Sequence, residues 1–226
     1  SGVSGQSGHN ASLLNGLCDS TLVSLLRARQ LCVYPPLVRK KIKSLVAAGT
    51  LNHDNDTVKN SSKLDAVIRK ISERKHNGNS KLVFCHFRGE IDALKNSLTK
   101  NGLHVKTFDG RTQTTERNQI ITSNCDVLIL QIQTGCEGLN LQQFNEVYFV
   151  SAHWNPAVED QAIARSHRIG QTRPVHVFRF GMRSFDDDNE TKTIDSYATE
   201  VQSTKREEMK YIDDHKDDDH KDDDHK

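Results

Sequence analysis

Long apolar runs are absent from this chain of 226 residues. No stretch approaches the roughly 18 apolar residues that a membrane-spanning helix needs. The first ten residues, SGVSGQSGHN, have neither a basic start nor an apolar centre, so they do not resemble a signal peptide. We therefore expect no membrane association.

Paired cysteines are missing as well. The chain has five cysteines, Cys18, Cys32, Cys85, Cys125 and Cys136, and none of them forms a CxxC pair. The odd number and the wide scatter argue against a disulfide framework and against a zinc site. The cysteines therefore favour a reducing, intracellular location.

The composition is that of a soluble globular chain with polar extensions, since 35% of its residues are hydrophobic and 27% are charged. Its length suits one domain, or one domain with appendages. The net charge of +1 hides an asymmetry, because residues 213–226 hold eight of the 30 acidic residues and only three of the 31 basic ones. The remaining body carries +6, a charge that suits a phosphate backbone but identifies no ligand.

Apolar segments of strand length alternate with segments of helical periodicity from residue 62 onward. We predict strands at Leu82–Phe87, Val105–Phe108, Asp126–Ile132, Val147–Val150 and Val175–Phe180, and helices that begin at Ser62, contain Ile91–Leu98, and span Thr115–Thr122 and Ala157–Arg168. Such alternation with short connections indicates a parallel sheet covered by helices, an α/β fold.

The flanking segments have a different character. We predict a disordered N-terminus at 1–16, a helical lead-in and linker at 17–61, the α/β lobe at 62–182, an acidic loop and a helix at 183–212, and a disordered Asp/His/Lys tail at 213–226. The lead-in carries a basic cluster, Arg39, Lys40, Lys41 and Lys43. This cluster is either a solvated helix face or a contact for a DNA backbone.

The stretch QAIARSHRIGQ (161–171) places Arg165 and Arg168 three residues apart, after a proline suited to the first turn of a helix. Residues at this spacing share a helix face. Two guanidiniums on one face suit a polyphosphate, because each can donate two hydrogen bonds and keeps its charge. For an arbitrary RxxR pattern, however, a solvated basic face is the commoner explanation.

Five segments resemble the Swi/Snf-type DNA translocases, a branch of the superfamily-two helicases. WNPAVEDQAIARSHRIGQTRPVHVFRF (154–180) contains a sequence similar to motif VI, TGCEGLNLQ (134–142) is similar to motif V, and KLVFCHF (81–87) is similar to motif IV. FDGRTQTTERNQII (108–121) and LLRARQLCVYPPLV (25–38) are similar to two further family segments, and all five occur in family order. The resemblance implies a RecA-like C-terminal helicase lobe with a helical lead-in and a C-terminal brace helix.

The resemblance also implies nucleotide contacts. Arg165 and Arg168 correspond to arginine fingers that reach the γ-phosphate of ATP across a cleft between two lobes, and Gln161 to a residue that orients them. In the motif V loop, Gly135 and Gly138 would approach the nucleotide, and Asn140 would face the ribose.

A second implied set lies where we expect the strands to end. Arg88, Arg111, Thr112 and Thr134 are candidate contacts for a DNA backbone. Trp154, the only tryptophan, is either a plug of the core or an aromatic group beside the DNA. We expect all of these segments, motif VI included, at the carboxyl ends of the strands, where open α/β sheets bind ligands.

The sequence has no GxxxxGK[ST] phosphate loop and no acidic strand motif for Mg²⁺. We therefore expect one lobe of a two-lobe ATPase, with ATP and Mg²⁺ as cofactors and Mg²⁺ held mainly by the first lobe. The implied partners are that N-terminal lobe and duplex DNA or nucleoprotein, and the implied location is the nucleus or a site of DNA or viral replication. The alternative is a binding module for nucleic acid or a partner ATPase, without catalysis.

Overall fold

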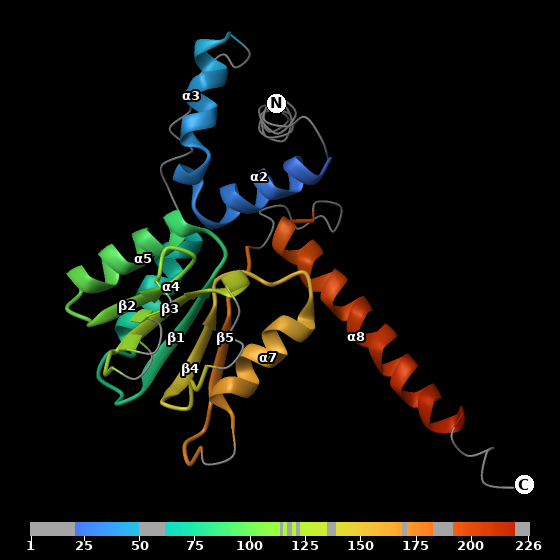
Figure 1. The fold of residues 1–226 in the computed structure, drawn as a ribbon. Helices are drawn as coiled ribbons and strands as arrows, with labels where there is room; N and C mark the ends of the chain where they lie inside the picture. The colour runs from blue at the N-terminus through green and yellow to red at the C-terminus, as the bar shows by residue number, and fades with distance from the viewer. Residues whose placement is uncertain are drawn as a thin grey trace, which may run out of the picture.

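The computed structural model describes residues 21–49, 62–113, 115–116, 119–120, 123–134, 139–168, 171–182 and 192–219. In chain order they form α2 (Thr21–Val33), η1 (Pro35–Leu37), α3 (Arg39–Ala47), α4 (Ser62–Glu73), β1 (Ser80–Cys85), α5 (Arg88–Lys100), β2 (Val105–Phe108), β3 (Val127–Gln131), η3 (Ile132–Thr134), β4 (Phe144–Phe149), α7 (Pro156–Ser166), β5 (His176–Arg179) and α8 (Ile194–Asp219). Figure 1 shows the strands as a central sheet with helices on both faces.

The sheet has five strands in the order β2-β3-β1-β4-β5, and every neighbouring pair is parallel. All six residues of β4 and all but the first residue of β1 are buried. Strands this apolar and this central are typical of a sheet covered on both faces. The α/β prediction is therefore confirmed.

Two layers of apolar side chains separate the sheet from its helices. Val83 and Cys85 of β1 face α4 and α5, whereas Leu82 and Phe84 face the opposite layer, to which α7 contributes Ala162. This alternation follows from the two-residue period of a strand. The side of the sheet that bears α7 is therefore distinct from the side that bears α4 and α5 (Figure 1).

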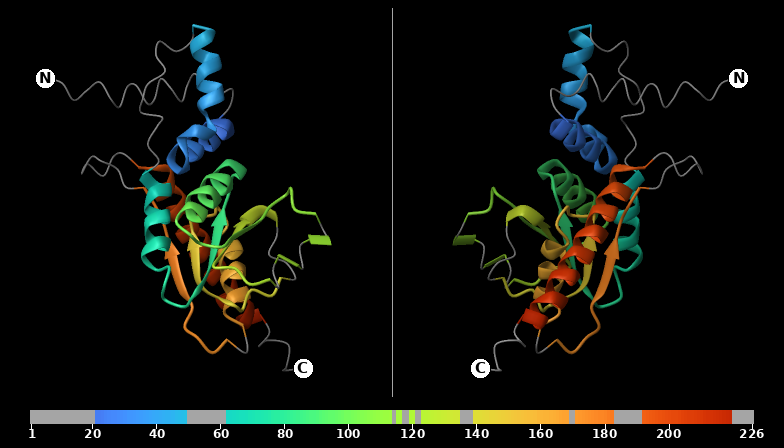
Figure 2. Two further views of the ribbon diagram at one scale, coloured as in Figure 1. Left: turned by 90° about the vertical axis from the view of Figure 1, so that its left-hand side faces the viewer. Right: turned by 90° about the vertical axis from the view of Figure 1, so that its right-hand side faces the viewer.

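Helices α2 and α3 lie beyond the edge of the sheet where the strands end, and α3 points away from the lobe (Figure 2). Arg39, Lys41 and Lys43 on α3 are exposed, while Ile42 on the same helix is buried against Val38. The solvated-face interpretation of this basic cluster fits these exposures, and a DNA contact there stays a prediction.

Helix α8 crosses the lobe beside α7 and extends past it (Figure 1). We predicted a disordered tail from residue 213, but the helix continues to Asp219. Extending an existing helix requires no new nucleation, which is the unfavourable step of helix formation. Residues 220–226, 1–20, 50–61 and 183–191 lie outside the described residues, so the predictions made for them have no structural counterpart.

Several predicted boundaries were wrong. β1 ends at Cys85 because the carboxylate of Glu90 accepts the backbone N–H groups of His86 and Phe87 and so begins α5. The predicted strand 126–132 is shorter, since Ile132 belongs to η3. The last strand is confined to His176–Arg179. Of the helix predicted at 115–122, residues 115–116 and 119–120 are described, and they are helical.

The largest boundary error concerns β4, which begins at Phe144 and not at Val147. The polar residues Asn145 and Glu146 concealed its first half, yet both are buried, and Glu146 has no exposed surface.

No helix among the described residues is long and apolar enough to span a membrane.

Glu146 is buried because several donors converge on it. Arg74 donates from Nε at 2.9 Å and from Nη2 at 2.7 Å, and Asn77, Asn79 and the hydroxyl of Tyr148 add hydrogen bonds of 2.6, 3.1 and 2.6 Å. Burial alone would raise the pKa of Glu146, but these hydrogen bonds outweigh it and lower the pKa to about 2. The network joins the turn after α4 to β4.

The lowered pKa of Glu146 predicts that the free energy of unfolding depends on pH. The contribution of Glu146 is fully present above its ordinary pKa of 4.5 and is lost as the pH falls toward about 2. Glu146→Gln should lower the unfolding free energy at pH 7 by about 3 kcal/mol, because Arg74 and the buried Lys81 lose their counter-charge. Urea unfolding followed by circular dichroism measures this loss, and the loss should shrink between pH 4.5 and 2.

The matched control is Glu73→Gln, which removes a carboxylate from an exposed pair with Lys70. Exposed pairs contribute roughly 0–1 kcal/mol, so this variant should resemble the parent at every pH. A Glu146→Gln deficit that stays constant from pH 7 to 2 would contradict the interpretation.

Candidate functional site

The predicted site residues fall at two opposite edges of the sheet. The edge where the strands end carries Arg88, Arg111, Thr112, Thr134 and Trp154, each in a segment that follows a strand. Helix α7 starts at this edge, separated from β4 by residues 150–155, and runs back toward the edge where the strands begin. Its far end meets the residues that precede β4 and β1, because Gln171 bonds to the carbonyl of Gln142 and Arg173 to that of Gly78.

The prediction that motif VI binds ligands at the carboxyl edge was therefore wrong for Arg165 and Arg168. A helix that connects two parallel strands must return to the side where the next strand begins. The pair at the end of α7 consequently lies at the amino edge of the sheet.

The pair also does not share a helix face. Arg165 belongs to the last turn of α7, which ends at Ser166, and His167 leaves the helical conformation with φ −95° and ψ 73°. Arg168 follows the helix and is exposed, whereas Arg165 is partly buried. Neither guanidinium has a carboxylate partner within ion-pair distance among the described residues.

Gln171 closes this end of α7. Its side-chain nitrogen donates to the carbonyls of Gln142 at 2.7 Å and Ser166 at 3.3 Å. Its side-chain oxygen accepts from the side chain of Asn145 at 3.4 Å and from the backbone N–H of Arg173 at 3.1 Å. Nothing in the spacing of Gln171 along the sequence indicated these partners.

The motif V segment connects the two edges. Thr134 lies in η3, after β3, and donates to the carbonyl of Gln131 at 2.7 Å. Asn140 is exposed near the start of β4 and accepts from the backbone N–H of Gln142 at 3.3 Å. Gly135 and Gly138 lie outside the described residues. The segment thus begins at the carboxyl edge and brings Asn140 to the amino edge.

Gln161 is exposed on α7, one turn before Arg165. Residues four apart lie on the same helix face. Gln161 and Arg165 therefore point to one side of α7, while Asn140 and Arg168 lie toward its far end.

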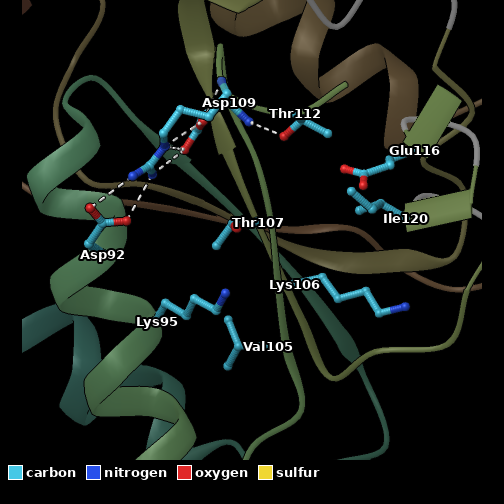
Figure 3. A pocket seen from close by; sticks show the side chains of 10 residues that line it. Asp92, Lys95, Val105, Lys106, Thr107, Asp109, Thr112, Glu116 and Ile120 are labelled. Atoms are coloured by element: carbon cyan, nitrogen blue, oxygen red, sulfur yellow. Dashed lines mark hydrogen bonds and ion pairs between the residues drawn. The ribbon is translucent and has the colours of Figure 1, made fainter. Parts of the chain in front are cut away.

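A pocket of about 450 Å³ lies at the edge strand β2, between α5 and the segment that follows β2 (Figure 3). Arg111 bonds there to two carboxylates, to Asp92 at 2.8 Å and to Asp109 at 2.5 Å. Thr112 accepts the backbone N–H of Asp109 at 3.1 Å. Hydrogen bonds from Arg111 lower the pKa of Asp109, so this carboxylate stays charged. Arg111 is thus already paired with two carboxylates, whereas Arg88 is exposed next to Gly110.

Trp154 lies between two elements that are distant in sequence. The guanidinium carbon of Arg29 on α2 is 5.2 Å from the ring centroid, and Tyr197 on α8 makes an edge contact at 6.0 Å. Arg29 is only 6% exposed and also donates to the carbonyl of Ala152 and to Nε2 of His86, the latter at 2.7 Å. Trp154 therefore fixes α2 and α8 over the strand ends, which fits the core-plug interpretation.

His86 is held neutral beneath this contact. Because a guanidinium only donates, Nε2 of His86 must accept from Arg29. Burial, followed by the charge of Arg29, lowers the pKa of His86 well below its ordinary value. Nearby, burial raises the pKa of Glu90 to about 7 in spite of two backbone hydrogen bonds.

Two buried contacts attach α8 to the lobe, one an ion pair and the other a hydrogen bond between an amide and a carboxylate. Lys63 on α4 bonds to Asp195 and to the hydroxyl of Ser151, each at 2.6 Å. Glu159, a fully buried residue of α7, accepts from Gln202 on α8 at 2.8 Å and from Arg179 on β5 at 3.0 Å. Nothing in the sequence pointed to these residues, because one-dimensional spacing cannot pair positions that lie far apart.

The donors at the amino edge suit a nucleotide. Guanidiniums bind phosphate oxygens, and carboxamides bind ribose hydroxyls. No group of three or more His, Cys, Asp or Glu side chains among the described residues is arranged to hold a metal ion.

The chain is similar to known helicases. Residues 62–170 match the family model of the helicase conserved C-terminal domain. The chain is 37% identical over 128 residues to the DNA repair protein RAD5 of Cryptococcus neoformans, an alignment that covers 53% of this chain and 11% of that protein. It is 36% identical over 124 residues to Helicase SWR1 of Saccharomyces cerevisiae, an alignment that covers 52% of this chain and 8% of that protein. The chain thus spans only a small part of either relative.

The fold also has a counterpart among solved structures. The crystal structure of the C-terminal part of the Fun30 ATPase domain aligns with 78% of this chain and 62% of that one, with a TM-score of 0.50 and 21% identity. This likeness concerns the fold. Together, the domain match and the fold confirm the resemblance predicted from the motifs.

The contacts of Gln171 and Arg168 predict different effects on stability. Gln171→Ala should lower the unfolding free energy of the chain by about 1–2 kcal/mol, because it removes four hydrogen bonds that close the end of α7. Arg168→Ala should change it by less than about 0.5 kcal/mol, as expected for an exposed surface residue. Urea unfolding of both variants measures the difference. Equal losses, or a larger loss for Arg168→Ala, would refute the assignment.

Proposed function

Residues 62–170 are a helicase conserved C-terminal domain like those of Swi/Snf-family helicases, and from this premise we propose that the chain is the second motor lobe of an ATP-dependent DNA translocase. In this proposal, ATP binds between this lobe and a first lobe of the same parent protein. Opening and closing of the cleft between the lobes then moves the motor along duplex DNA or nucleoprotein. We propose residues 62–182 as the bounds of the lobe.

One observation carries the proposal. The residues implied in nucleotide binding and those implied in DNA binding separate onto opposite edges of one sheet. A motor needs such a separation, because a change at the nucleotide must move a distant DNA contact. Helix α7 and the motif V segment both connect the two edges, so they are the elements through which we expect the coupling to pass.

Arg165 and Arg168 act as arginine fingers in this proposal. Hydrolysis of ATP transfers the γ-phosphoryl group to water, and negative charge on its oxygens must be stabilised. Guanidiniums without a carboxylate partner provide this stabilisation when the cleft closes. Gln161 orients the pair, and Asn140, with Gly135 and Gly138, contacts the nucleotide.

The carboxyl edge holds the DNA backbone through Arg88, Thr112 and Thr134. Arg111 contributes less than a free arginine would, because Asp92 and Asp109 already bind it. Trp154 acts indirectly, by holding the helical lead-in and α8 in place beside the proposed DNA-binding edge. We propose that Mg²⁺ is held mainly by the first lobe and that the parent protein works in the nucleus or wherever its DNA is replicated.

The central prediction concerns the two-lobe parent protein. Arg168→Ala should reduce kcat for ATP hydrolysis by roughly a hundredfold or more, while the affinity for DNA stays unchanged. Arg168→Lys should restore little, because an ammonium cannot reproduce the planar donor geometry of a guanidinium. The measurement is steady-state ATPase activity at saturating duplex DNA.

Arg173→Ala is the matched control, since Arg173 is also exposed and lies near the same edge, where it bonds to the carbonyl of Gly78. It should leave kcat within a factor of about three of the parent, because an exposed arginine away from the nucleotide contributes little. An unaltered kcat in Arg168→Ala would remove the arginine from catalysis. A parent protein without DNA-stimulated ATPase activity would favour the alternative of a binding module.

The isolated chain should bind duplex DNA weakly, without sequence preference and with strong salt dependence. Two or three phosphate contacts correspond to a slope of about −2 in a plot of log affinity against log salt concentration. Arg88→Ala should reduce the magnitude of the slope by about one. Arg173→Ala, at the opposite edge, should not change it. Fluorescence anisotropy with a labelled 20-base-pair duplex gives both values, and binding insensitive to salt would contradict the proposal.

A further inference from the structure

A groove of about 600 Å³ lies between α2 and α8, above the strand ends. Its walls are mostly apolar: Leu22, Leu25 and Leu26 line it from α2, Tyr197 and Val201 from α8, and Phe87 and Trp154 from the loops between them. Leu22 is 78% exposed, and Leu26 and Tyr197 are each 44% exposed. Large apolar side chains gathered at one exposed site indicate an interaction surface.

The polar groups of the groove are cationic or neutral. Lys205 and Arg29 carry positive charge, and His86, His153 and Gln133 complete the lining. Among the described residues, no carboxylate lines the groove. Arg29 is buried and donates to a carbonyl oxygen and a histidine nitrogen, and the negative charges of Asp195, Glu90 and Glu159 act on it from a greater distance. Lys205 is exposed at the border of the groove, so it is the cation that favours an anionic partner there.

We propose that this groove is the docking site for an acidic amphipathic helix of a partner protein. Its apolar face would cover Leu22, Leu26 and Tyr197, and a carboxylate at its border would pair with Lys205. A helix that lies in an apolar groove is a common mode of peptide recognition, with anchors at i, i+3 or i+4, and i+7. The proposal goes beyond the motor function and does not depend on it.

Duplex DNA fits the groove less well. A phosphate backbone is held by polar and cationic contacts, whereas most of these walls are aliphatic or aromatic. The ring of Trp154 is also in contact with Arg29 and Tyr197, so it is not a free platform for a base. We therefore assign the groove to a protein segment and treat DNA as a competing outcome of the test.

Trp154 provides the readout, because it is the only tryptophan of the chain and lines the groove. The probe is a synthetic, tryptophan-free helical peptide of about 14 residues, about four turns, with leucines on one face and glutamates on the other. Titrated into the full chain, it should shift the emission of Trp154 and reach saturation. A peptide with lysines in place of the glutamates should bind at least tenfold more weakly, and one with serines in place of the leucines should not bind.

A charge reversal in the protein tests the same contact from the other side. Lys205→Glu should weaken the glutamate peptide at least fivefold. Lys210→Glu is the matched control on the same helix, since Lys210 is exposed and does not line the groove. It should bind the peptide like the parent chain, and thermal unfolding of both variants verifies that they fold.

Three results would overturn the proposal. The first is equal binding of the glutamate and lysine peptides, which would leave no role for charge. The second is a 20-base-pair duplex that displaces the peptide and shifts Trp154 by itself, which would assign the groove to DNA. The third is a shift that depends on protein concentration without peptide, accompanied by dimers in sedimentation, which would assign it to a second copy of the chain.

Discussion

A helix that joins two parallel strands has to run back against them, and the positions of the functional groups in this lobe follow from that constraint. The loop after β4 stays at the carboxyl edge with Trp154, while α7 carries Arg165 to the amino edge, nine residues along the helix from Pro156. The described ends of motif V lie at the same two edges, Thr134 after β3 and Asn140 before β4. The residues proposed to bind the nucleotide and those proposed to bind DNA are therefore separated by the length of the strands.

Buried charges fix the elements that cross this distance. Lys63 and Asp195 attach α8 to α4, Gln202 and Glu159 attach it to α7, and Glu159 also joins α7 to Arg179 of β5. The charges of Lys63, Asp195 and Glu159 are removed from water and would be costly without their partners. A displacement of α8 would leave such a group unpaired, so α7 and α8 are held to move as one body with the sheet. Rigidity of this kind suits a lobe that is proposed to pivot as a unit against another one.

Around this rigid body, the chain presents three surfaces of different chemistry. At the amino edge, Arg165 and Arg168 form no ion pair with a described carboxylate, an arrangement that suits phosphate. At the carboxyl edge, Arg88 is exposed and Arg111 is already tied by two carboxylates. The groove between α2 and α8 combines apolar walls with positive charge. Trp154 lies at the carboxyl edge and also lines the groove, so these two surfaces adjoin, whereas the amino edge shares no described residue with the groove.

The sequence by itself determined the fold class, the family and the order of the elements, because apolar periodicity and short motifs are local properties of the chain. It failed where a long-range partner decided the outcome. The first half of β4 was hidden by Glu146, which only Arg74 and its neighbours make compatible with burial. The helix that bears Arg165 ends before Arg168, where Gln171 bonds to a loop 29 residues earlier in the chain. Tertiary structure alone tied Arg111 to Asp92 and placed Trp154 between α2 and α8, since a side chain's partners are set by packing in three dimensions.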